Sequence, residues 1–466
     1  MHPKSEKNVD ERPALSRRQF VARSAGAAVL AAGLSAPRAY AATDKPAVLG
    51  GTPVRKGPWP KWAISDQSDE QAMVAVLRTG NWFRYAGKSS TVDQFEAEWA
   101  RTVGARYCQA TNSGTASLIT SLGALGIGAG DEVLLPPYTF VATVNCVLLL
   151  HALPVFVDSD PTTAQMDTRK IEERINANTR CLLPVHYGGY SCDMDQVMAI
   201  ARRRNLSVVE DACQSHAGEW KGRRLGTIGD TGCYSFQNSK MLTCGDGGAL
   251  VTNDEKLYFR AQAFHNNGNA KFKHDGGFTA NGGNFRLTQF QGALLLEQLK
   301  RFEEQARRRE ANLNSLNKLL AGIDGIEPKK ALAGTTRHGS YLYVFSYEPE
   351  KFAGMDKDTF RAAVAAEGVP VDDGYSALNK APWVERFLSA RGFRRIYGEA
   401  RLRQWREENQ LPANDAMIPH TCRLTHQILL APPEEMEKIA LAFERVQRHA
   451  GEIARANKKR RSAAGG

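Results

Sequence analysis

Short apolar segments alternate with amphipathic helical segments between about residue 64 and residue 300 of this 466-residue chain. Strands that alternate with helices pair in parallel, because each helix carries the chain back across the sheet before the next strand begins. Parallel sheets are covered by helices on both faces, so their strands are apolar throughout. We therefore predict an α/β fold with a largely parallel sheet. The expected strands lie at residues 132–135, 153–157, 181–185, 207–210 and 248–251.

The chain is longer than one hydrophobic core usually allows, which predicts two domains and some flanking segments. Residues 42–63 are rich in Pro and Gly and contain Trp59 and Trp62, so we expect an extended arm that packs on the body. Residues 64–305 are assigned to a large domain, with a long helix expected over 286–322. Residues 306–450 are assigned to a small C-terminal α+β domain, with a strand at 341–347 and helices at 357–367 and from 434. Residues 451–466 are predicted to form a disordered basic tail.

The first 41 residues have the features of an export signal. Arg17 and Arg18 precede a weakly apolar run over residues 25–34, and Ala39, Tyr40 and Ala41 form a small-x-small cleavage pattern. These features resemble a twin-arginine signal that is cleaved after Ala41, which predicts a periplasmic or extracellular protein that folds in the cytoplasm first. The alternative is an accidental Arg-Arg pair in a disordered tail.

The net charge of +11 does not indicate nucleic-acid binding, because most of it lies at the two ends of the chain. Residues 1–41 contribute +4 and residues 458–461 another +4, which leaves +3 for the body. No basic stripe interleaved with aromatic residues is present, so no nucleic-acid partner is expected. The eight cysteines form no Cys-x-x-Cys pair and have no His at ligand spacing, so no metal site is expected. No apolar run reaches eighteen residues, so no membrane span is expected.

Residues 112–118 combine a Gly-Thr turn with the start of an apolar helical pattern. Free backbone N–H groups and the positive end of the helix dipole at such a turn suit a phosphate group. Gly114 and Thr115 are therefore candidates for phosphate binding. A simple N-cap is the alternative interpretation.

An apolar segment ends in Glu210 and Asp211, where open α/β sheets place their ligand-binding loops. A buried carboxylate at this point could keep a pyridinium nitrogen protonated and so make an aromatic ring an electron sink. The alternative is an aspartate that caps the next helix. His216 follows closely and could be catalytic, or it could pack beneath a cofactor.

Lys240 stands in a largely uncharged stretch, five residues after Ser235 and ahead of the glycine-rich turn at 245–248. Desolvation disfavours the charged form of a lysine, so we expect this amine to be readily neutralised and nucleophilic. Ser235 is close enough in sequence to offer its hydroxyl to the same phosphate. A lysine on a surface loop is the alternative.

These motifs occur in the order expected of a fold-type-I enzyme that uses pyridoxal 5'-phosphate (PLP). Over nearly all of residues 48–450 the chain resembles the DegT/DnrJ/StrS family of PLP-dependent sugar and cyclitol aminotransferases. The resemblance implies a mainly parallel sheet of the seven-stranded type with a smaller C-terminal α+β domain. The matching stretches are 112–118, 130–133 through 154–158, 185–188, 210–218, 235–248 and 284–286 with Gln291.

The resemblance also implies residue roles. Lys240 matches the lysine that holds PLP as a Schiff base and then shuttles a proton, and Asp211 matches the acid at the pyridine nitrogen. Gln214 matches the residue near the phenolic oxygen of the ring. The other implied contacts to PLP are Gly114, Thr115 and Ser235 at the phosphate, Phe140 stacked on the ring (with Tyr138 as an alternative), and Asn284 at the phosphate of a neighbouring subunit.

The role of Asn284 implies a homodimer with shared active sites. The arm segments at 50–55 and 58–62 resemble the branch that acts on keto-cyclitols and on an aminohydroxybenzoate precursor, with glutamine or glutamate as amino donor. The expected reaction is therefore transfer of an amino group to a keto sugar or keto-cyclitol. Two alternatives are a PLP-dependent dehydratase or elimination enzyme, and an exported homologue that binds a sugar or PLP without turnover. Lys240 argues against the dehydrating branch, which has His at this position.

Overall fold

The computed structural model describes residues 45–85, 90–269 and 280–464, with side chains to residue 459. One compact unit begins at Pro46. The predicted signal at 1–41 lies outside the described residues, so export stays a prediction. Within the described ranges, no helix has both the length and the apolar composition of a membrane span.

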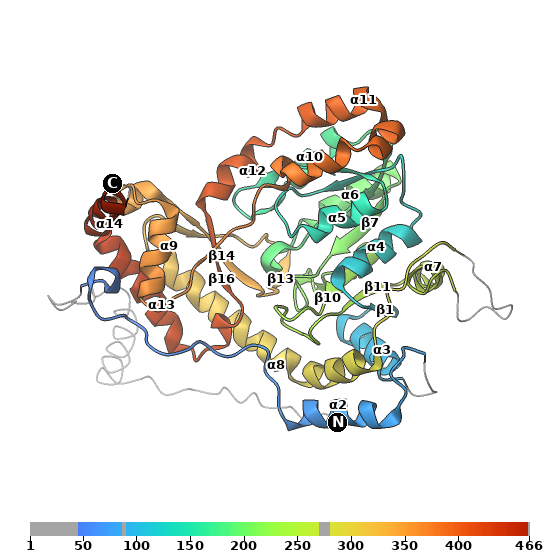
Figure 1. Cartoon of the computed structure of the whole chain (residues 1–466), viewed down its shortest axis with the longest axis horizontal. Helices are drawn as coiled ribbons and strands as arrows, with labels where there is room; N and C mark the ends of the chain where they lie inside the picture. The colour runs from blue at the N-terminus through green and yellow to red at the C-terminus, as the bar shows by residue number, and fades with distance from the viewer. Residues whose placement is uncertain (1–44, 86–89, 270–279, 465–466) are drawn as a thin grey trace, which may run out of the picture. The chain divides into compact units, whose positions relative to one another are not determined.

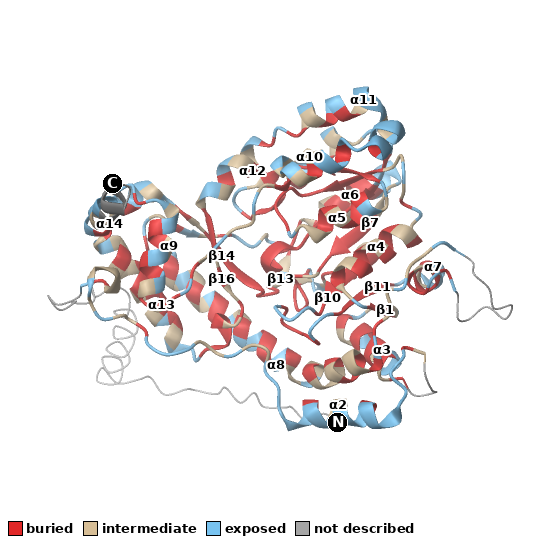
Figure 2. Cartoon of the chain, viewed as in Figure 1, coloured by how far each residue is buried: buried red, intermediate tan, exposed pale blue. Residues whose placement is uncertain are grey.

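Within these ranges the centre of the fold is a seven-stranded sheet, and its strands are almost entirely buried (Figures 1 and 2). Adjacent strands from β10 to β3 pair in parallel, and only β11 runs antiparallel to its two neighbours. The predicted α/β fold is confirmed. The strand order is β1 (Tyr107–Thr111), β11 (Gly248–Thr252), β10 (Thr231–Ser235), β7 (Ser207–Asp211), β6 (Thr179–Leu182), β2 (Glu132–Leu135) and β3 (Leu153–Phe156).

Helices cover this sheet and begin at short polar side chains that cap their free N–H groups. Ser113, Asp193 and Asp254 cap three of them through hydrogen bonds of 3.1, 3.0 and 3.0 Å. The first packs on β10 and β11, the second on β6 and β7, and the third on β1. The helices of this region are α2 (Gln67–Thr79), α3 (Thr91–Val103), α4 (Gly114–Ala124), α5 (Ala142–Leu149), α6 (Met194–Arg204), α7 (Glu255–His265) and α8 (Gln289–Leu320).

A second core lies around an antiparallel sheet in the C-terminal part. Its strands are β12 (Ile326–Pro328), β14 (Leu342–Tyr347), β16 (Thr421–Thr425) and β15 (Asp372–Asp373), packed against α9 (Lys357–Ala366) and α13 (Glu434–Arg448). Helix α8 joins the two cores, since Phe302 is buried in the first and Leu313 in the second. Figure 1 shows α8 running from beneath the large sheet toward α13. The predicted boundary at residue 305 therefore falls inside one continuous helix.

Part of the predicted small domain packs on the large sheet instead. The helices α10 (Pro382–Leu388), α11 (Arg391–Glu408) and α12 (Pro412–Met417) lie between β15 and β16 in sequence. Trp405 Nε1 donates to the Pro154 carbonyl at 2.6 Å, and Arg401 pairs with the buried Glu132 at 2.6 Å. This segment therefore adds to the first core, and Figure 2 shows an exposed outer side on α11.

The predicted disordered tail is helical as far as it is described. Helix α14 (Ala450–Ala464) is rich in Ala, Lys and Arg, which have high helix propensity. It is also tethered, because Ala450 and Ile453 are buried in the second core and Asn457 donates to Thr359 Oγ1 at 2.6 Å. Composition alone indicated disorder, whereas the apolar contacts of the first turns stabilise a helix.

The arm runs along the second core before it reaches the large sheet. Ala47 and Val54 donate backbone N–H groups to the Glu367 carboxylate at 2.7 and 2.9 Å. Arg55 pairs with Glu435 at 2.7 Å.

The remaining short strands are β4 (Ser159–Asp160), β5 (Gln165–Met166), β8 (Glu219–Trp220), β9 (Arg223–Arg224) and β13 (Thr335–Arg337). Single turns of 3-10 helix are η1 (Ala47–Leu49), η2 (Thr168–Lys170), η3 (Glu172–Arg174), η4 (Tyr187–Gly189), η5 (Pro349–Phe352), η6 (Leu378–Lys380), η7 (Ile418–His420) and η8 (Ile428–Leu430).

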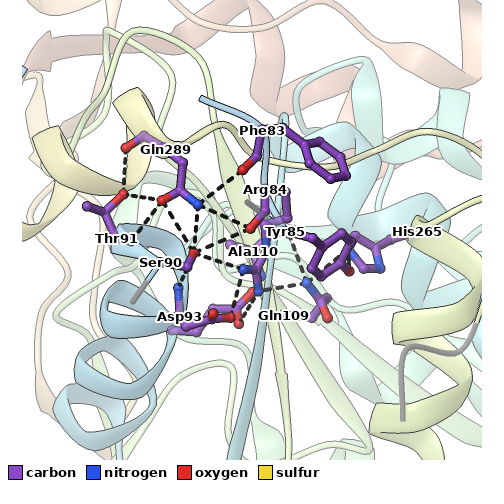
Figure 3. Close-up of polar contacts among 11 residues, drawn as sticks. Phe83, Arg84, Tyr85, Ser90, Thr91, Asp93, Gln109, Ala110, His265 and Gln289 are labelled. Atoms are coloured by element: carbon purple, nitrogen blue, oxygen red, sulfur yellow. Dashed lines mark hydrogen bonds and ion pairs between the residues drawn. The ribbon is translucent and has the colours of Figure 1, made fainter. Parts of the chain in front are cut away.

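A buried ion pair ties α3 to β1 and to the segment before α3 (Figure 3). The Arg84 guanidinium contacts Glu96 and Asp93 at 2.7 Å each. Glu96 also accepts hydrogen bonds from the Ala110 N–H at 2.7 Å and from Gln109 at 3.0 Å. Burial raises the pKa of Glu96 to about 7, and the charge of Arg84 opposes this rise. The pair therefore depends on Arg84 to keep the buried carboxylate ionised.

We expect Arg84→Met to lower the free energy of unfolding by about 3 kcal/mol, because it leaves a buried carboxylate without its cation. Arg101→Met is the matched control, since Arg101 pairs with Glu98 on the exposed side of α3 and should contribute at most about 1 kcal/mol. Loss of the Arg84 charge raises the pKa of Glu96 further in the folded state, so the variant should lose stability progressively as the pH rises from the ordinary glutamate pKa of about 4.5 to beyond 7. Urea unfolding at several pH values measures both effects. Equal losses for the two variants would contradict this prediction.

Candidate active site

A cavity of about 570 Å³ opens at the edge where the parallel strands end. Asp211 is the last residue of β7, Ser235 is the last of β10, and Gly114 begins the helix that follows β1. This is where open α/β sheets bind ligands. The lining residues are Ser113, Gly114, Thr115, Leu118, Phe140, Ala142, Thr143, Asp211, Cys213, Gln214, Ser235, Gln237, Ser239, Lys240, Asp246, Tyr341, Leu342, Tyr375, Arg423 and Thr425.

The Asp211 carboxylate is held in a fixed orientation at this edge. Its Oδ2 accepts a hydrogen bond from the Thr143 hydroxyl at 2.8 Å, and its Oδ1 accepts from the Cys213 N–H at 3.2 Å. Thr143 is itself within 3.1 Å of the Thr139 hydroxyl. Asp211 is buried yet lines the cavity, so its carboxylate is accessible to a ligand there.

The first turn of α4 approaches β10 and β11 very closely. A Cβ on Gly114 would lie 2.6 Å from the Ser235 Cβ, which no side chain could tolerate without a shift of the backbone. The Ser113 hydroxyl caps the Ala116 N–H, and the first N–H groups of the helix have no acceptor within it. Gly114, Thr115 and Ser235 therefore present N–H and hydroxyl donors to the same end of the cavity, as predicted for a phosphate site.

Lys240 is buried and lines the cavity, with its Nζ 4.6 Å from the centre of the Tyr341 ring. Desolvation acts to lower its pKa, but Tyr341, Tyr375, Cys213 and Asp211 together raise the pKa above its ordinary value. The expectation that burial neutralises this amine is therefore wrong for the protein alone. Among the described residues no carboxylate forms an ion pair with Lys240, so the amine stays available to a ligand.

Gln214 and Phe140 also line the cavity. Gln214 accepts the Gly188 N–H at 2.8 Å, which fixes its side-chain amide. Phe140 lines the cavity and is 52% exposed, whereas Tyr138 is 1% exposed and accepts the Tyr375 N–H at 3.1 Å. Phe140 is therefore the better placed of the two candidates for stacking on an aromatic ligand.

His216 and Asn284, like Tyr138, do not line the cavity. His216 packs among Trp99, Tyr234 and Phe236, and its Nε2 donates to the Ser235 carbonyl at 2.7 Å. Burial lowers the pKa of His216 to about 3, so the ring is neutral and supports the Ser235 backbone. Asn284 is exposed and does not line the cavity of its own chain.

Sequence motifs did not identify the residues that the C-terminal part of the chain contributes to the cavity. Tyr341, Tyr375 and Arg423 come from segments with no recognisable motif. The Arg423 guanidinium lies 4.6 Å from the Tyr375 ring, and its Nε has no hydrogen-bond partner among the described residues. Arg423 and Lys240 are the two basic side chains among the lining residues. For these three lining residues, the sequence analysis offered only the predicted strand that begins at Tyr341.

A model of the DegT/DnrJ/EryC1/StrS aminotransferase family matches residues 64–391. The fold and the cavity are thus those of an α/β transferase, and the chain belongs to this aminotransferase family. Its activity is accordingly that of an aminotransferase.

The curated relatives include cyclitol aminotransferases. An L-glutamine:2-deoxy-scyllo-inosose aminotransferase from Streptoalloteichus tenebrarius is 33% identical over 433 residues, which cover 87% of this chain and 98% of the relative. An L-glutamine:scyllo-inosose aminotransferase from Streptomyces griseus is 32% identical over 424 residues, with coverages of 88% and 99%. Among solved structures, 3-amino-5-hydroxybenzoic acid synthase has a TM-score of 0.75 at 27% identity, covering 84% of this chain and 99% of that one.

The family implies PLP as cofactor, and the donor set of the cavity fits it. The start of α4 and Ser235 suit its phosphate, and the exposed aromatic side chain of Phe140 suits its ring. Asp211 offers a fixed carboxylate for a pyridine nitrogen, and Lys240 offers an unpaired amine for an aldehyde. These groups line one cavity, so a single PLP molecule could engage all of them.

Proposed function

We propose that the protein is a PLP-dependent aminotransferase that moves an amino group from L-glutamine to a keto-cyclitol. The observation that carries the proposal is that Lys240, Asp211 and the start of α4 line one cavity. The curated relatives that match nearly the whole chain are named for glutamine and for scyllo-inosose compounds, which supports this donor and this class of acceptor. The arm at residues 50–62 supports the same branch of the family.

When bound, PLP supplies an electron sink that lets an amino group pass between an amino acid and a ketone. Asp211 would hold a proton at the ring nitrogen, because its carboxylate is fixed by Thr143 and by the Cys213 N–H. The N–H groups of Gly114 and Thr115 and the Ser235 hydroxyl would bind the phosphate. Phe140 and Gln214 would orient the ring from its face and its edge.

Lys240 would first hold the cofactor through Nζ and would then carry a proton between the α-carbon of the amino donor and the cofactor. The Tyr341 ring, whose centre lies 4.6 Å from Nζ, favours this second task, because a ring face attracts the protonated amine. The buried position keeps bulk water away from that proton. The residues of the chain thus supply the positioning and the proton transfer.

Replacing Lys240 tests the proposal. The wild-type protein should bind PLP with its characteristic visible absorbance, which L-glutamine should bleach and scyllo-inosose should restore. Lys240→Ala should lose at least about 10²–10⁴-fold in turnover, because it removes the nucleophile and the proton carrier. Lys221→Ala is the control, since Lys221 is exposed and pairs with Asp195. A wild-type protein that takes up no PLP, or a Lys240→Ala variant with full turnover, would refute the proposed function.

Arg423 is the residue we assign to the carboxylate of the amino donor, because it brings a positive charge to the cavity and its Nε has no hydrogen-bond partner among the described residues. Arg423→Met keeps the apolar stem and should lower kcat/KM for glutamine by about 10–100-fold through loss of a charge-assisted hydrogen bond. The decarboxylated analogue of glutamine provides the control, since wild type and variant should use it equally poorly. An unchanged kcat/KM for glutamine would exclude this role.

We also infer a homodimer in which Asn284 reaches the partner's cavity. The Asn284 loop is bordered by large exposed apolar side chains, including Phe83 at 53% and Trp82 at 48%, and Arg286 lies over the Phe83 ring. Exposed clusters of this kind mark protein interfaces. Sedimentation velocity should give a dimer for the wild type and a weakened dimer for Phe83→Glu. Leu149→Glu, at an exposed site on α5, should leave the dimer intact, and a monomeric wild type would contradict the inference.

A further inference from the structure

Ring N–H groups from three distant parts of the chain hold the backbone of the segment that carries Lys240. Trp62 Nε1 donates to the carbonyls of Asn238 and Lys240 at 2.9 and 3.1 Å. His426 Nε2 lies 2.9 Å from the Ser239 carbonyl, and His216 Nε2 bonds the Ser235 carbonyl. A carbonyl oxygen only accepts, so both imidazoles carry their proton on Nε2.

The rings also pack against one another around a buried guanidinium. Trp62 and His426 meet edge to face with ring centres 4.9 Å apart. The Arg309 guanidinium lies 4.9 Å from the Trp62 ring, is fully buried, and has no hydrogen-bond acceptor among the described residues. Its contact with the indole face therefore replaces the usual ion pair. Burial and the charge of Arg309 hold the pKa of His426 well below its ordinary range, so the ring stays neutral.

Trp62 has a close structural counterpart in the same arm. Trp59 Nε1 also donates to a backbone carbonyl, that of Gly368, at 3.0 Å, and the Arg55 guanidinium lies 3.6 Å from its ring. Trp59, Arg55 and the Glu367 contacts already anchor the arm to the second core. Arm anchoring therefore does not account for the two bonds that Trp62 makes to the lysine segment.

We propose that Trp62 and His426 are positioning residues for Lys240: their N–H donors fix the main chain at residues 238–240 and so set where Nζ stands in the cavity. The inference rests on the proposed PLP function. It adds two residues that support the site without lining the cavity. The donors come from the N-terminal arm and from the loop after β16. Two segments that are far apart in the sequence therefore hold the main chain beside Lys240. The carbonyls of Asn238, Ser239 and Lys240 accept these hydrogen bonds.

Trp62→Phe and Trp59→Phe form a matched test, because each removes one indole N–H from the arm and keeps an aromatic ring. Trp62→Phe should weaken PLP binding about tenfold and shift the absorbance maximum of bound PLP, whereas Trp59→Phe should change PLP affinity by less than about twofold. Equilibrium dialysis against free PLP measures affinity independently of turnover. Circular dichroism and thermal unfolding would show that both variants fold.

A second pair covers the case in which Trp62→Phe fails to fold. His426→Gln keeps an N–H donor near the position of Nε2 and should retain PLP affinity within about threefold, whereas His426→Leu should weaken it about tenfold. Equal PLP affinity and absorbance for Trp62→Phe and wild type would overturn the proposal, as would equal losses in Trp62→Phe and Trp59→Phe. If the wild type takes up no PLP, both the proposed function and this inference are refuted. If the wild type binds PLP and the variants do not behave as expected, only this inference is refuted.

Discussion

The close contact between the first turn of α4 and strands β10 and β11 determines the geometry of the active site. Gly114 stands where any Cβ would collide with Ser235, and Gly248 stands where a Cβ would collide with the Ser113 carbonyl. Two missing side chains therefore let the positive end of a helix reach the edge of the sheet. The N–H groups of that turn, the Ser235 hydroxyl and the Asp211 carboxylate can line one cavity only because of this approach.

The active site also requires that the two cores keep a fixed distance and orientation. Helix α8 contributes Phe302 to one core and Leu313 to the other, without a break between them. Arg423 reaches the cavity from β16 of the small sheet, and Tyr341 and Tyr375 lie beside strands of that sheet, so their distance from Lys240 depends on how this helix joins the two cores. The segment from α10 to α12 also connects the two cores. It lies between β15 and β16 of the small sheet in sequence, but it packs on the large sheet.

The parts of the fold that follow from local pattern were predictable from the sequence. Apolar segments with turns between them predicted the parallel strands at 132–135, 153–157, 181–185 and 207–210, and the end of the last of these placed Asp211 at the edge of the sheet. The strand that ends at Ser235 was not among those expected. The pKa of Lys240 was not predictable, because Tyr341 and Tyr375 lie more than a hundred residues later and outweigh desolvation together with Cys213 and Asp211. Arg423 was missed for the same reason. The helical tail shows the converse, since a few buried side chains order a segment whose composition resembles a disordered one.

The arm has a consequence for the order in which the chain assembles. Its residues leave the ribosome early, whereas its partners Glu367, Gly368 and Glu435 are synthesised much later. His426, which binds the same lysine segment as Trp62, is also synthesised late. Contacts of such large sequence separation form late, since a long loop must close before they contribute. The large sheet can therefore form while Trp62 is still undocked, and the main chain beside Lys240 gains its last hydrogen bonds only after β16 has been synthesised. A nascent or C-terminally truncated chain would contain every residue of the phosphate site and still lack a fixed lysine.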